Sequence, residues 1–67
     1  MIEKTFINPT TNKQWRIEID GHTIRTCPHG GKVKEILCDS AFQVKSKAAS
    51  AMMGQMRKGF VYQNPDA

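Results

Sequence analysis

The residue types best suited to chemistry in this chain are two cysteines and two histidines. His22, Cys27, His29 and Cys38 are the ligand types that a tetrahedral zinc site uses. Structural zinc sites usually combine two close pairs of ligands, whereas here only Cys27 and His29 are close in sequence. We therefore expect no metal and no cofactor. Because the N-terminus lacks the layout of a secretory signal, we also expect both thiols to be reduced.

Catalysis would need a nucleophile beside a base, two close carboxylates or a metal. The six acidic residues are dispersed singly along the chain, and no third group in the sequence is placed to orient Cys27 with His29. The sequence therefore predicts a protein that is not an enzyme.

Binding is better supported, because ten Lys and Arg against six Asp and Glu give a formal net charge of +4. Basic residues gather around the Gly30-Gly31 loop, whose backbone N–H groups could approach a phosphate closely, and at the end of the predicted helix. The candidate nucleic-acid-binding residues are Arg25, His29, Lys32, Lys34, Arg57 and Lys58. The same charges also suit a solubilising surface, a protein partner or another domain of the same chain.

These residues must be positioned by the elements around them, of which a helix over Ser40–Lys58 is the longest. Its apolar residues recur at spacings of three and four, and they are Val44, Ala48, Ala51, Met52 and Met56. Asp39 and Ser40 are N-cap residues, and Gly59 is a C-terminal stop. Gly54 interrupts the helix, and we expect close approach to another backbone there.

Short strands account for the rest of the chain. Lys13–Asp20 alternates with Trp15, Ile17 and Ile19 on one face, and Asp20-Gly21 predicts a type I′ hairpin to His22–Cys27. Further strands are expected up to about Asn8, within Lys32–Cys38 and at Phe60–Tyr62, and the last residues have the composition of a frayed end or a linker. The predicted fold is α+β: an antiparallel sheet of about five strands with one long helix across one face.

The chain has 67 residues, which is enough for one domain, residues 1–67, with one thin core. No run approaches the roughly 18 to 20 apolar residues of a membrane span. We therefore expect a cytoplasmic protein with no membrane partner.

The order of these residues resembles the WGR domain, known from DNA-dependent poly(ADP-ribose) polymerases and from bacterial proteins. The similarity covers nearly the whole chain, and its best parts are Asn12–Ile17, Asp20-Gly21 and Gln55–Phe60. The Trp-Gly-Arg tripeptide that names the family is absent after Ile24, where the chain reads Arg25–Lys34. No residue here therefore inherits by identity the DNA contacts that this tripeptide makes in the family.

The resemblance implies a non-catalytic binding module at the N-terminus of a larger, regulatory protein. Together with the charge, it predicts weak and largely sequence-independent binding of DNA or another nucleic acid. The alternative is a protein–protein or interdomain docking module.

Overall fold

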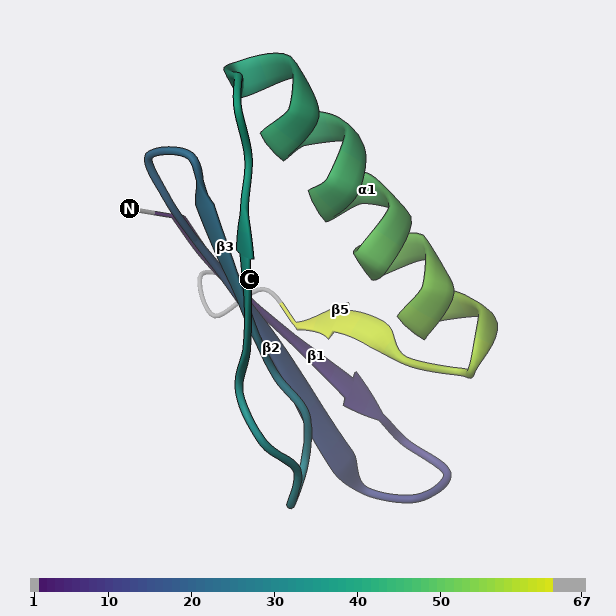
Figure 1. Cartoon of the computed structure of the whole chain (residues 1–67). Helices are drawn as coiled ribbons and strands as arrows, with labels where there is room; N and C mark the ends of the chain where they lie inside the picture. The colour runs from purple at the N-terminus through teal and green to yellow at the C-terminus, as the bar shows by residue number, and fades with distance from the viewer. Residues whose placement is uncertain (1, 64–67) are drawn as a thin grey trace.

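The computed structural model describes residues 2–63, which form a five-stranded antiparallel sheet with one helix packed against it (Figure 1). The elements in chain order are β1 (Ile2–Asn8), β2 (Lys13–Asp20), β3 (Thr23–Cys27), β4 (Lys34–Leu37), α1 (Ala41–Arg57) and β5 (Val61–Gln63). The strands lie in the order β4-β3-β2-β1-β5. The predicted α+β fold is therefore confirmed, and the predicted linker after Gln63 lies outside the described residues.

The core lies between the sheet and the helix, and β2 supplies its centre. Trp15 and Ile17 are buried and Ile19 is half-buried, as the alternation of this strand predicts. The Trp15 ring packs at 5.5 Å between centroids against Phe6 of β1, and Phe6 packs at 5.5 Å against Tyr62 of β5. These three rings join both ends of the chain in one cluster.

The β2–β3 hairpin is confirmed, but its turn is not the predicted one. Asp20 pairs with Thr23, so the two loop residues are Gly21 and His22. Gly21 has φ 61°, while His22 is not among the residues with positive φ. Positive φ at the first loop position alone is typical of a type II′ turn, in which Gly occupies that position. The turn is therefore shifted by one residue from the predicted Asp20-Gly21.

The helix begins and ends where its capping residues predict. The Ser40 hydroxyl accepts a hydrogen bond from the Gln43 backbone N–H at 3.2 Å, while the Gln43 side chain accepts one from the Asp39 N–H at 3.0 Å. At the other end Gly59 has φ 100°, a conformation that glycine adopts without strain.

The helix crosses the sheet diagonally, because it starts at the end of β4 and leads to β5 at the opposite edge (Figure 1). Val44 and Ala48 of the predicted stripe are buried, but Met56 is 49% exposed. The prediction for Gly54 is wrong, because a Cβ there would meet no atom within 4 Å. Its position in the helix has no packing reason that we can identify.

The two cysteines are free thiols in different surroundings. Cys38 is buried in the core beneath the helix, whereas Cys27 is only half-buried. Cys27 pairs with Arg16, whose neighbour Trp15 faces the core, so Cys27 points to the face without the helix.

We expect alkylation of the native protein to modify Cys27 at least about tenfold faster than Cys38, because reaction at Cys38 requires opening of the core. Mass spectrometry during a time course measures both rates. After denaturation both residues should react, and elemental analysis should find no stoichiometric zinc. Equal native rates, or one zinc per chain, would contradict this placement.

Candidate nucleic-acid interface

The face of the sheet away from the helix carries more carboxylates than cations. Glu3, Glu18, Arg25 and Glu35 are aligned across β1 to β4 in one row. Arg25 is one of the predicted nucleic-acid contacts, but its Nε donates to the Glu35 carboxylate at 3.0 Å. Its other cross-strand neighbour is Glu18. A phosphate approaching Arg25 would therefore meet carboxylates on both sides.

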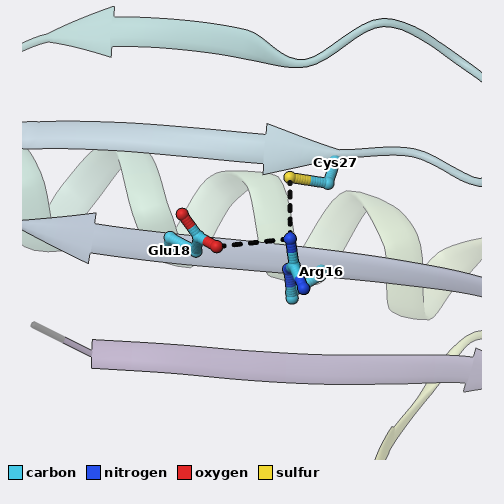
Figure 2. A network of polar contacts seen from close by, with 3 residues as sticks. All are labelled: Arg16, Glu18 and Cys27. Atoms are coloured by element: carbon cyan, nitrogen blue, oxygen red, sulfur yellow. Dashed lines mark hydrogen bonds and ion pairs between the residues drawn. The ribbon is translucent and has the colours of Figure 1, made fainter.

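Arg16 of β2 is also paired with a carboxylate on this face (Figure 2). Its Nη2 lies 3.3 Å from the Glu18 carboxylate and donates to the Cys27 sulfur at 3.8 Å. The pKa of the Arg16 guanidinium is raised, because the group donates to Cys27 and lies beside the carboxylates of Glu18 and Glu3. Figure 2 shows α1 behind the strands, so this network lies on the uncovered face.

By contrast, the end of the sheet where β1 turns into β2 carries basic side chains. Lys13 begins β2 there, and the helix ends beside it, because Asn8 is both the partner of Lys13 and in contact with Lys58. The loop that follows Cys27 leaves the sheet at the same end and carries His29 and Lys32. We call this region the basic end, and its residues are Lys13, His29, Lys32, Arg57 and Lys58.

Carboxylates lie away from the basic end in the part of the chain that the structure describes. Glu3, Glu18 and Glu35 occupy the row described above, while Asp20 and Asp39 lie farther along, near the Gly21-His22 turn and the start of the helix. Lys34 borders the basic end on β4, one row from the glutamates but on the other face of the sheet. The fold therefore gathers four of the ten Lys and Arg side chains at an end where none of the described carboxylates lies.

Asn8 holds two parts of the basic end together. It is 7% exposed, and its Nδ2 donates to the backbone carbonyl of Lys58 at 3.2 Å. Its Oδ1 accepts hydrogen bonds from the N–H groups of Thr10 and Thr11, at 2.9 and 3.3 Å. The side chain thus links the end of the helix to the β1–β2 loop and fixes the position of Lys58 relative to Lys13.

The Gly30-Gly31 loop offers less backbone than the sequence suggests. The Gly31 N–H donates to the Pro28 carbonyl at 3.3 Å, and Gly30 has φ 70° at the third position of this four-residue turn. Positive φ there is typical of a type II turn. The Gly31 N–H is therefore already used within the loop, and the neighbouring side chains of His29 and Lys32 are exposed.

The structure thus brings together His29, Lys32, Arg57 and Lys58 at one end and places Arg25 elsewhere. Sequence reasoning missed Lys13 and Asn8. Lys13 lies 44 residues before Arg57, and only the pairing of β1 with β2 brings it near the helix end. Asn is a residue type common in turns, and nothing in the sequence around Asn8 indicates a contact with Lys58.

Residues 2–63 contain no group of three or more His, Cys, Asp and Glu side chains placed to hold a metal ion. Within the same range, no helix combines the length and the apolar character needed to cross a membrane.

Comparison of the chain with protein-family models, with curated proteins and with solved structures finds no match.

Proposed function

We propose that this chain is a WGR-like, non-catalytic module that binds nucleic acid weakly, with little sequence preference, through its basic end. The observation that carries the proposal is the segregation of charge: five basic or titratable side chains share one end of the sheet, and the described carboxylates lie away from it. Nucleic-acid affinity of this kind depends on phosphate contacts by Lys and Arg.

The width of the basic end supports this proposal. Lys58 lies beside β1 and the His29–Lys32 loop leads to β4, three strand spacings away. Across the sheet, three spacings of about 4.8 Å span roughly 14 Å. Cations spread over such a width can contact more than one phosphate, because duplex DNA carries one negative charge per about 1.7 Å of helix axis.

Little base reading is expected from this arrangement. The one helix packs its Val44 and Ala48 face on the sheet, so it is not free to enter the major groove as a recognition helix. Phosphate contacts position a protein on DNA without reading sequence.

Titration with a duplex DNA at several salt concentrations tests the proposal. With three to four phosphate contacts, the slope of log affinity against log salt should be about −3. Near physiological salt the dissociation constant should lie between about 1 and 100 µM. Absence of any binding at ~50 mM salt, with protein at hundreds of micromolar, would exclude nucleic-acid binding and favour the docking alternative.

The place of the module in a regulatory protein is a further part of the proposal and follows from the resemblance to WGR domains. The sequence that follows Ala67 in the full gene is the observation that tests it. A helical-repeat or catalytic region there would favour docking within a larger protein, and a stop codon would favour an independent binder.

A further inference from the structure

An apolar groove runs between the first half of the helix and the N-terminal half of β1, and it uses none of the residues of the basic end. Its volume is about 650 Å³. Its lining includes Ile2 and Lys4 of β1, Ile19 of β2, and Phe42, Lys45 and Met52 of the helix. The groove exists because the helix crosses the sheet diagonally and leaves this corner of β1 and β2 uncovered.

One wall of the groove is a strand edge. β5 pairs with β1 only from Thr5 to Ile7, so β1 has no partner on this side over Ile2–Lys4 within the described residues. Backbone N–H and C=O groups on such an edge are available to another extended chain. Large apolar side chains flank the edge, since Ile2 is 54% and Phe42 is 80% exposed.

The charge of the groove selects among possible occupants. Its two charged lining residues are Lys4 and Lys45, and no carboxylate is among the lining residues. The Lys4 ammonium lies 5.8 Å from the centroid of the Tyr62 ring, which holds it at the point where β5 stops. A second copy fits poorly in the registers that pair most of this edge, because β1 against β1 with both groove faces aligned then sets Glu3 against Glu3, or Lys4 against Lys4.

We propose that this groove binds an extended, acidic segment of another protein, which adds a strand to β1 at Ile2–Lys4. Side chains of a strand alternate between the two faces of a sheet. The segment therefore carries a carboxylate opposite Lys4, an apolar residue opposite Ile2 and a second apolar residue toward Phe42. One residue lies between the carboxylate and the residue opposite Ile2. It is uncharged or basic, because it lies opposite Glu3 on the face of the sheet away from the helix. Strand addition of this kind obtains affinity from the backbone and specificity from alternate side chains.

The test is an NMR titration of the full chain with the blocked peptide acetyl-Thr-Asp-Thr-Val-Thr-Leu-amide. We expect binding with a dissociation constant on the order of 0.1–1 mM, as is reasonable for a short unstructured peptide. Amide signals of Ile2–Thr5 and Phe42–Met52 should shift, and those of Lys32 and Lys58 should not. The same peptide with Lys in place of Asp should bind at least about tenfold more weakly.

Two further comparisons separate strand addition from loose apolar contact. Peptides N-methylated at odd or at even positions should differ, because only alternate N–H groups of an added strand face β1. The Lys4→Glu/Lys45→Glu variant should prefer the Lys peptide over the Asp peptide, and its own spectrum reports whether it is folded.

The proposal is overturned by any of the following results: no shifts at millimolar peptide, equal binding of both N-methylated peptides, or shifts confined to the basic end. Groove signals that move with protein concentration alone would instead assign the groove to a second copy. Contacts of Ile2–Lys4 with residues 64–67 in the free protein would assign it to the chain itself.

Discussion

Replacement of Trp15 by alanine should lower the free energy of unfolding by roughly 3–5 kcal/mol. The side chain is 5% exposed, and its ring packs on Phe6, the residue that also contacts Tyr62 of β5. A domain of this size has a total stability of about 3–10 kcal/mol. The expected loss is therefore a large part of the total stability, so the urea midpoint of the variant should fall far below that of the unchanged protein.

Urea denaturation followed by circular dichroism measures this effect, because Trp15 is the only tryptophan and its fluorescence is lost in the variant. Arg16→Ala is the matched control on the same strand. Its side chain is 43% exposed on the uncovered face, and its ion pair with Glu18 is a surface pair, so little change is expected. Equal stability of the two variants would mean that the facing of β2 is wrong.

Reversal of charge at the helix end should abolish DNA binding. In the Arg57→Glu/Lys58→Glu variant each substitution replaces a positive charge by a negative one, so the net charge falls from +4 to 0. We expect a loss of at least about 30-fold in affinity at ~50 mM salt, because two phosphate contacts become repulsive. The fold should be retained, since both side chains are exposed and Asn8 bonds the backbone of Lys58.

A control with the same net charge shows whether position matters. Lys45→Glu/Lys47→Glu also gives a net charge of 0, but both residues are exposed on the first half of the helix, away from the basic end. Its affinity should fall less than about fivefold through long-range electrostatics alone. If both variants lose the same affinity, binding depends on net charge and not on the basic end. Lys32→Glu tests the loop in the same assay.

Local signals predicted most of the fold. The alternation of Trp15 and Ile17 correctly predicted which face of β2 is buried. The helix begins after Ser40 and ends before Gly59, as their capping preferences indicate. Errors arose where a local signal has two solutions. A glycine after Asp20 fits either a type I′ or a type II′ turn, and the pairing of Asp20 with Thr23 decides between them.

Met56 and Gly54 show a second limit, since helical periodicity does not tell over which turns a helix is buried. The stripe continues in sequence to Met56, but full burial ends at Ala48, and Ala51 and Met52 are only half-buried against the core. Met56 is exposed, and a Cβ at Gly54 would have open space beside it.

The candidate site was less predictable, because its electrostatics depend on strand register. Arg25 looks like an available cation in the sequence, and only the pairing of β3 with β4 places Glu35 opposite it. Conversely, Lys13 joins the basic end through the pairing of β1 with β2. Nucleic-acid binding by the six residues inferred from sequence stays a prediction, and the geometry favours testing Lys13 with them.

The pairing of β1 with β5 has a consequence for synthesis of the protein. Phe6 pairs with Tyr62, so the first strand of the chain gains its second neighbouring strand only from β5, the last strand described. The hairpins β1–β2 and β2–β3 can form while the chain is still on the ribosome, since their contacts are local in sequence. Until Val61–Gln63 emerges, however, the nascent sheet exposes one edge of β1 along its whole length and one side of the Phe6 ring. A nascent or prematurely ended chain of this protein is thus most open to aggregation and to chaperone binding at its first strand.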